Sequence, residues 1–240
     1  IIQINKGDLI VVASRPAMGK STLVLNILSN VVIKEKKAVL LFNLESSKEN
    51  IINKLIISNS MVEVDKFEIY DKYQKGKIIK PELTDDDWNR IAYGLNILKD
   101  APIFIGTNTP YTINDICKRS RELKPKENIE LIIIDYLQLI QFDKSKALSR
   151  DNETREILKE LKILAKELNI PIIITSQLSR KTEEKNDKRP IITDFSNTSS
   201  SILTYSNKIL FLYRDSYYNE SNKSNITDVI VAKNDKGEIR

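Results

Sequence analysis

Short, continuously apolar runs alternate along the chain with longer stretches in which apolar residues recur at helical spacing. The apolar runs predict buried strands at residues 8–12, 38–42, 102–105, 131–136, 171–177, 208–213 and 227–233. The amphipathic stretches between them predict helices over residues 20–34, 48–58, 84–98, 112–123 and 152–168. This alternation predicts an α/β fold in which a mainly parallel central sheet is flanked by helices.

Three polar segments interrupt this pattern. Residues 60–80 predict a mixture of short helix and surface loop, residues 144–150 a basic loop, and residues 180–201 a long surface loop with one short helix. The acidic triplet at residues 85–87 follows Thr84 and precedes an amphipathic stretch. This order predicts a helix that starts with Thr84 as its N-cap, rather than a metal site, because acids suit the positive end of a helix.

Composition narrows the classes of protein to which the chain can belong. The 240 residues are 41% hydrophobic, enough for one sizeable core, and no apolar run approaches the ~20 residues of a membrane span. The absence of histidine excludes His-based catalysis, and the single cysteine, Cys117, is expected to be buried in a helix. The net charge of +5 permits a polyanionic partner, but a Lys-rich composition bias explains it equally well.

The most informative segment joins the first predicted strand to the first predicted helix. It matches the phosphate-binding pattern G-x-x-x-x-G-K-[ST] except that serine replaces the first glycine, and an ordinary strand-to-helix turn is the alternative. A helix start offers unpaired N–H groups to an anion. Lys20 is expected to reach the β- and γ-phosphates of a nucleotide and Ser21 to place its hydroxyl on Mg²⁺. The predicted nucleotide contacts are Ser14, Arg15, Pro16, Ala17, Met18, Gly19, Lys20, Ser21 and Thr22.

Three further polar residues end apolar strands. Asp135 fits a carboxylate that holds Mg²⁺ opposite Ser21, with a turn aspartate as the alternative. Glu45 fits the base that orients an attacking water, provided that its strand lies beside the strand before the phosphate loop. A solvent-facing loop glutamate explains Glu45 equally well. Gln177 can sense the γ-phosphate through its amide, and a simple polar strand end is as good an explanation.

Seven short segments occur in a fixed order over nearly the whole chain. They are RPAMGKS (15–21), NLES (43–46), LTDDDW (83–88), IDYLQL (134–139), SQLSR (176–180), DKRP (187–190) and LFLYRD (210–215). Together they resemble the C-terminal motor domain of DnaB-type replicative DNA helicases. In that family alanine is usual at the position of Ser14, so the departure from the loop pattern is no anomaly.

The resemblance implies a RecA-like P-loop NTPase core that spans residues 1–240 as a single domain. It also implies a homo-hexameric ring that hydrolyses Mg-ATP between subunits, moves along single-stranded DNA and unwinds duplex. By position, Lys20 and Ser21 match the Walker A lysine and hydroxyl, Glu45 the catalytic glutamate, Asp135 the Walker B aspartate and Gln177 the glutamine of the DNA-sensing motif.

The resemblance extends to context. Because the chain starts at Ile1 and stops beside a predicted turn, we expect a fragment without the family's N-terminal helical domain and final strands. The full-length protein would meet primase and a helicase loader in the cytoplasm of a bacterial, phage or plastid type of replication system, with no membrane partner.

Two departures from the family pattern affect the expected function. Lys233 matches the family lysine that reaches the neighbouring subunit's ATP site, but Asp235 stands where an arginine finger is expected. The loop that faces DNA in the family corresponds to residues 194–207 here, and it has lost the family's arginine, acids and glycine. We therefore expect weaker DNA contacts there, through backbone and side-chain donors. The predicted DNA contacts are Lys144, Lys146, Arg150, Ser196, Asn197 and Ser199; the first three are explained equally well as a solvated surface loop.

These departures leave a second function open, a nucleotide-binding paralogue that turns over slowly and acts as an assembly or regulatory subunit. Lys20, Glu45, Asp135 and Gln177 argue against it, because a dead copy has no physical need for all four. A RecA-like recombination or clock-type ATPase is disfavoured by the DKRP and LFLYRD segments.

Overall fold

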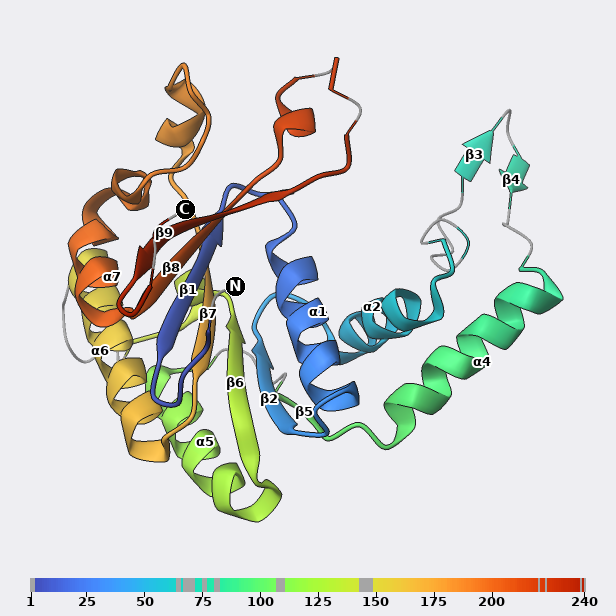
Figure 1. The fold of residues 1–240 in the computed structure, drawn as a ribbon, viewed down its shortest axis with the longest axis horizontal. Helices are drawn as coiled ribbons and strands as arrows, with labels where there is room; N and C mark the ends of the chain where they lie inside the picture. The colour runs from blue at the N-terminus through green and yellow to red at the C-terminus, as the bar shows by residue number, and fades with distance from the viewer. Residues whose placement is uncertain are drawn as a thin grey trace.

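The computed structural model describes residues 3–63, 66, 72–74, 77–79, 83–106, 111–142, 149–219, 221–222, 224–237 and 239. Within them, one sheet has seven strands in the order β5-β2-β6-β7-β1-β8-β9 (Figure 1). All neighbours in it are parallel except β8 and β9. The strands are β1 (Leu9–Ser14), β2 (Ala38–Asn43), β5 (Ile103–Gly106), β6 (Ile129–Asp135), β7 (Ile172–Gln177), β8 (Lys208–Tyr213) and β9 (Asp228–Asn234).

Helices cover both faces of this sheet because its central strands are apolar on both sides. Along β1, Leu9 and Val11 pack with residues of α5, α6 and α7, whereas Ile10 and Val12 pack with residues of α1 and α2. Figure 1 shows α5, α6 and α7 together on one side, while α2 and α4 extend away from the other side. The helices are α1 (Lys20–Ile33), α2 (Lys48–Ser60), α4 (Asp85–Lys99), α5 (Ile113–Glu127), α6 (Arg150–Leu168) and α7 (Ser199–Tyr205).

The structure confirms the predicted α/β fold and the seven predicted strands of the large sheet. It also confirms the start of α4: Asp87 Nα donates to Thr84 Oγ1 at 3.2 Å, and the Asp87 carboxylate accepts from Thr84 Nα at 3.0 Å. Cys117 is 4% exposed in α5, and burial raises the pKa of its thiol to about 11. Within the described residues, no helix combines the length and apolarity needed to cross a membrane.

The polar segments were predicted less well. In residues 60–80, where no strand was predicted, β3 (Lys72–Gln74) and β4 (Lys77–Ile79) form an antiparallel pair. Strands this short show no alternation that a sequence pattern can detect. The predicted loop at residues 180–201 contains η2 (Arg180–Glu184), η3 (Ile192–Thr198) and the start of α7. Phe195 and Ile202 are buried and pack this segment against the core. The helical turns were not predicted because two isolated apolar residues show no helical periodicity.

The predicted basic loop at residues 144–150 lies mostly outside the described residues, including Lys144 and Lys146. Arg150 is described, and it is the first residue of α6 rather than a loop residue. The helix starts here because Ser149 is its N-cap, with its side chain accepting from Asn152 Nα.

Candidate active site

The polar ends of four strands meet at one edge of the sheet. Because β1, β2, β6 and β7 run parallel, their carboxyl ends lie together, with Ser14 beside Gln177 and Asn43 beside Asp135. This edge is where ligands bind in open α/β sheets. A pocket of about 460 Å³ opens there, lined by Pro16, Ala17, Gly19, Lys20, Ser21, Thr22, Glu45, Ser46, Lys54, Asp135, Tyr136 and Gln177.

Helix α1 begins in this pocket without the features that begin its neighbours. Serine or threonine side chains cap α2, α4, α5 and α6, but α1 has Gly19 as its N-cap, no capping hydrogen bond among the described residues and no acid in its first turn. Its first N–H groups therefore keep a partial positive charge directed into the pocket, which favours an anion.

Gly19 is required by its backbone conformation. Its φ of 91° lies in the left-handed region, where a side chain is strained. A Cβ built at this position meets no atom of the described residues within 4 Å. The space here is open to a phosphate, but it is the turn itself that needs glycine. Ala17 also has a positive φ, 62°, so the loop holds two residues in this region within three positions.

Lys20 lies over the loop rather than in solvent. Its Nζ donates to Ser14 O at 3.3 Å, Ser14 Oγ at 3.2 Å and Arg15 O at 3.3 Å. Burial lowers the pKa of Lys20, and the carboxylates of Asp135 and Glu45 oppose this shift. The ammonium therefore stands in a partly desolvated pocket whose neutral acceptors satisfy it only in part, a position suited to a phosphate group.

Asp135 and two hydroxyl groups form a compact oxygen cluster at the pocket floor. Ser21 Oγ donates to Asp135 Oδ2 at 2.7 Å, and Thr175 Oγ1 donates to Asp135 Oδ1. Asp135 is 3% exposed, so both contacts fix a buried carboxylate. Carboxylate and hydroxyl oxygens are hard ligands, and one charged oxygen beside one hydroxyl fits the few protein ligands that Mg²⁺ takes in phosphate sites. Thr175 escaped the sequence analysis because nothing in its strand marks it.

Glu45 reaches the pocket by a different route from the one assumed. The sequence argument made its role conditional on its strand lying beside β1, and that condition is not met, because β6 and β7 lie between β2 and β1. Glu45 is nevertheless an exposed pocket residue, because its strand neighbours the one that ends in Asp135. Asn43 fixes the turn, its Oδ1 accepting from Glu45 Nα at 3.2 Å and Ser46 Nα at 2.7 Å.

Three predicted nucleotide contacts direct their side chains elsewhere. Arg15 is 8% exposed; its Nε pairs with Glu183 at 2.9 Å, and another guanidinium nitrogen donates to Leu178 O at 2.8 Å. Met18 packs in the core under α1, and Ser14 Oγ donates to Arg15 O at 2.7 Å. None of these three residues lines the nucleotide pocket. The sequence analysis also missed Lys54 and Tyr136 in the pocket wall; burial raises the pKa of Tyr136, helped by Glu45 and Asp135.

A second pocket of about 430 Å³ lies on the other side of Gln177, which lines both pockets. Its wall includes Arg150 and Ser196, two of the predicted DNA contacts. Ser196 has φ 57° and ψ −132°, and its carbonyl accepts from Ser199 Oγ at 2.6 Å. Asn197, between them in the chain, is exposed. The structure thus brings two of the predicted DNA contacts, Arg150 and Ser196, to a pocket that Gln177 also lines.

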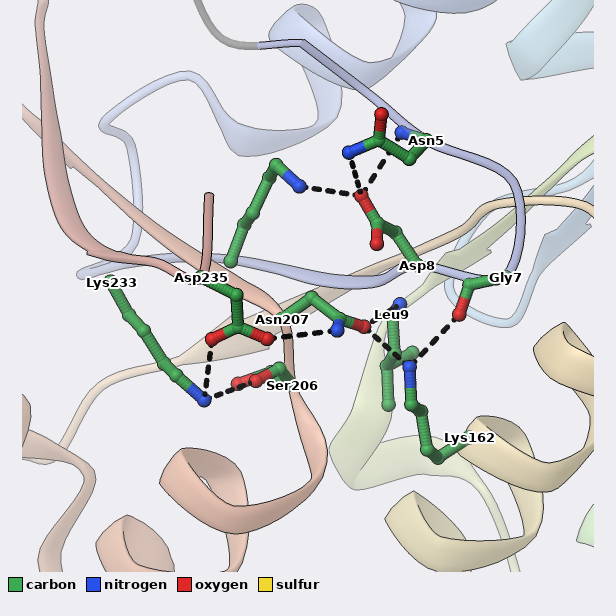
Figure 2. A network of polar contacts seen from close by, with 10 residues as sticks. Asn5, Gly7, Asp8, Leu9, Lys162, Ser206, Asn207, Lys233 and Asp235 are labelled. Carbon is green, nitrogen blue, oxygen red and sulfur yellow. Dashed lines mark hydrogen bonds and ion pairs between the residues drawn. The ribbon is translucent and has the colours of Figure 1, made fainter. Parts of the chain in front are cut away.

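Lys233 and Asp235 lie far from this edge. Strand β9 is antiparallel to β8, so they stand at the amino ends of β8 and β1, opposite the phosphate loop (Figure 2). Lys233 Nζ donates to Leu203 O at 2.8 Å and Ser206 O at 2.6 Å, and it pairs with Asp235 at 3.3 Å. The Asp235 carboxylate also accepts from Asn207 Nδ2 at 2.9 Å. Neither side chain serves the pocket of its own chain.

Three features define a nucleotide-binding domain of the P-loop class. They are the start of α1 without a side-chain cap, Lys20 in the phosphate loop, and the acids Glu45 and Asp135, which follow β2 and end β6. A family model described as the DnaB-like helicase C terminal domain matches residues 2–240. The chain belongs to this family.

Curated relatives agree with this assignment. The chain is 36% identical over 236 residues to the replicative DNA helicase DnaB of Geobacillus stearothermophilus, and 36% identical over 240 residues to a probable replicative DNA helicase of Trieres chinensis. These alignments cover 98% of this chain but 49% and 50% of the two relatives. The chain thus spans about half the length of the curated relatives it matches.

Solved structures agree on the fold. One described as an ATPase domain matches with a TM-score of 0.87 at 30% identity, covering 98% of this chain and 80% of that one. Another, described as a DnaB-like replicative helicase and its interactions with primase, gives a TM-score of 0.88 at 30% identity. It covers 99% of this chain and 54% of that one. The architecture is therefore RecA-like.

Proposed function

We propose that this domain is the ATP-hydrolysing motor of a replicative DNA helicase. The observation that carries the proposal is the convergence of Lys20, Ser21, Glu45, Asp135 and Gln177 on one pocket at the mouth of an uncapped helix. Each of these side chains has a separate task in phosphoryl transfer to water, and no simple structural role brings all five together.

In this proposal the pocket residues divide the work by their chemistry. Lys20 exchanges its carbonyl partners for the β- and γ-phosphates of ATP, and the α1 N–H groups hold the phosphate oxygens. Ser21 and Asp135 hold Mg²⁺, which when bound neutralises charge on the phosphates. The exposed carboxylate of Glu45 orients the attacking water and accepts its proton. Gln177 hydrogen-bonds the γ-phosphate and responds to its loss.

The proposal places ATP between subunits of a homo-hexameric ring. Lys233 lies on the edge opposite the pocket, so it can meet a nucleotide only when a neighbouring copy presents one. Single-stranded DNA would contact Arg150, Ser196, Asn197 and Ser199, near the second pocket. Primase and a helicase loader would act on the full-length protein; the chain itself aligns with about half of each curated relative.

One observation favours a second candidate, a slow paralogue that binds nucleotide and assembles with active subunits. Lys233 is held by two carbonyls and by Asp235, and Asp235 takes the place of the expected arginine finger. Loss of an arginine finger lowers turnover by about 10³-fold or more. The complete pocket argues for the motor, and the arrangement in Figure 2 argues for the slower alternative.

Steady-state ATP turnover of the full-length protein, with and without single-stranded DNA over a range of protein concentrations, tests the proposal. A motor predicts turnover that rises with both protein concentration and DNA, and that Lys20→Ala removes. Nucleotide binding without DNA-stimulated turnover would support the slow paralogue. Failure to bind ATP at all would refute both functions.

A further inference from the structure

The last residues of β7 are held differently on their two sides. On the β1 side, the parallel register continues to the strand end, with Ser14 opposite Gln177. On the β6 side, the register within the described residues ends earlier, at Ile134 opposite Ile174. The backbone of Gln177 therefore extends past β6 just where its side chain enters the nucleotide pocket, and it needs another partner on that side.

One side-chain amide supplies that partner. Gln138, in the short helix η1 (Leu137–Leu139), donates from Nε2 to Gln177 O at 3.0 Å and accepts at Oε1 from Gln177 Nα at 3.2 Å. The same Nε2 lies 3.0 Å from Ser176 Oγ. The amide thus binds both backbone groups of Gln177, as a neighbouring strand would, and fixes the peptide that carries the Gln177 side chain.

The backbone carbonyl of Gln138 contacts a different element from its side chain, the start of α6. Its carbonyl accepts from an Arg150 guanidinium nitrogen at 2.6 Å, and Arg150 is the first residue of α6. Gln138, Gln177 and Arg150 all line the second pocket, together with Ser196. A continuous set of hydrogen bonds therefore runs from the start of α6, through Gln138, to the residue that separates the two pockets.

We propose that Gln138 is a positioning residue that transmits the state of the second pocket, through the Gln177 backbone, to the nucleotide pocket. This inference rests on the proposed ATPase function. It assigns a role to Gln138, to which the sequence motifs gave none. Gln138 does not line the nucleotide pocket, so it acts on the reaction only through Gln177. When the phosphates of a bound DNA strand attract the Arg150 guanidinium, the Gln138 carbonyl loses this donor or its position shifts. The Gln177 peptide then moves because the Gln138 side chain is hydrogen-bonded to it.

A purely structural role for Gln138 is the competing explanation, and the two differ in what they predict. Gln138 is an exposed residue, so replacing it opens no cavity in the core. A structural role predicts that nucleotide affinity, unstimulated turnover and stability decline together. A coupling role predicts that only the response of turnover to DNA declines, because Lys20, Ser21 and Asp135 keep their own contacts.

The test is Gln138→Met in the full-length protein, a change that keeps side-chain length and removes all three side-chain hydrogen bonds. Gln141→Met is the matched control, because it makes the same change three residues later and leaves the contacts to Gln177 in place. ATP turnover is measured against the concentration of a single-stranded oligonucleotide, together with KM for ATP, nucleotide affinity and the thermal midpoint.

We expect Gln138→Met to reduce the DNA stimulation factor by about tenfold, within the range by which residues between two sites change their coupling. Unstimulated turnover and nucleotide affinity should match those of the control. Undiminished stimulation in Gln138→Met would overturn the inference, and so would a parallel fall in affinity and unstimulated turnover. If the wild-type protein shows no stimulated turnover, the proposed motor function fails and the coupling role fails with it; a loss confined to the variant concerns Gln138 alone.

Discussion

The buried ion pair between Asp8 and Lys208 gives the most quantitative prediction. The Lys208 side chain is 2% exposed at the start of β8, and the Asp8 side chain is 10% exposed just before β1. Asp8 Oδ2 accepts from Lys208 Nζ at 2.5 Å. It also accepts from Asn5 Nα at 3.0 Å (Figure 2). Asp8→Asn keeps the shape of the side chain but leaves the ammonium buried without a counter-charge. The pair joins the start of β1 to the start of β8, so its loss weakens the contact between these two neighbouring strands.

Removing one partner of a buried pair costs about 3–5 kcal/mol, because the remaining charge has lost its solvent and its counter-ion. For a domain of this size, 1 kcal/mol corresponds to about 2–4 °C in the thermal midpoint. Asp8→Asn should therefore lower the midpoint by about 6–20 °C. The double variant with Lys208→Met should recover most of this loss, because both charges are then absent.

Thermal and urea unfolding followed by circular dichroism measure these effects. The acid range adds an independent check on the same pair. Burial acts to raise the pKa of Asp8, but hydrogen bonds from Lys208 and Asn5 outweigh it, and the pKa lies below its usual 3.8. The stabilisation is therefore complete above that pH and is lost as pH falls through the lowered pKa. The gap between wild type and Asp8→Asn should narrow in the same range. A loss below about 1 kcal/mol at neutral pH would refute the treatment of this pair as buried and coupled.

Three shorter predictions concern other parts of the chain. Glu45→Gln should keep ATP affinity and lose hydrolysis, measured by equilibrium binding and turnover, because the amide cannot accept the proton of water; weakened binding with normal turnover would contradict the base role. Asp235→Arg should raise ring turnover, by up to about 10³-fold, if this position faces the neighbour's ATP and Lys233 is released; no gain in an assembled ring would mean that position 235 lies elsewhere. Hydrogen bonds from Thr84 lower the pKa of Asp87 to about 2, so Asp87→Asn should destabilise the fold at pH 5, and the difference should shrink as pH falls from about 4 through about 2; a difference that is undiminished at pH 2 would show that the cap acts without its charge.

Much of the candidate site was predictable because its residues sit at positions that the chain marks locally. Lys20 and Ser21 follow an apolar strand and begin a helix, while Asp135 and Gln177 end apolar strands. Parallel strands bring their carboxyl ends to one edge whatever their order, so a list of strand ends already predicts a shared pocket. The same reasoning explains why Glu45 lines the pocket although β6 and β7 separate its strand from β1.

Side-chain direction was not predictable within the phosphate loop. Nine consecutive residues were assigned to the nucleotide, but Arg15 turns to Glu183 and Met18 turns into the core. The motif specifies the backbone path and two functional side chains. The other side chains follow whatever partners the surrounding fold offers, and those partners come from distant parts of the sequence.

The sequence by itself determined the alternation of strands and helices, the parallel sheet, and which residues stand at its carboxyl edge, because these depend on periodicity and local signals along the chain. Only the tertiary structure decided the strand order and three sets of hydrogen bonds. These join Gln138 to Gln177, Thr175 to Asp135, and Lys233 to carbonyl groups of its own chain. Each of these depends on register between segments tens of residues apart, and a change of one residue in register turns a side chain to the opposite face of the sheet.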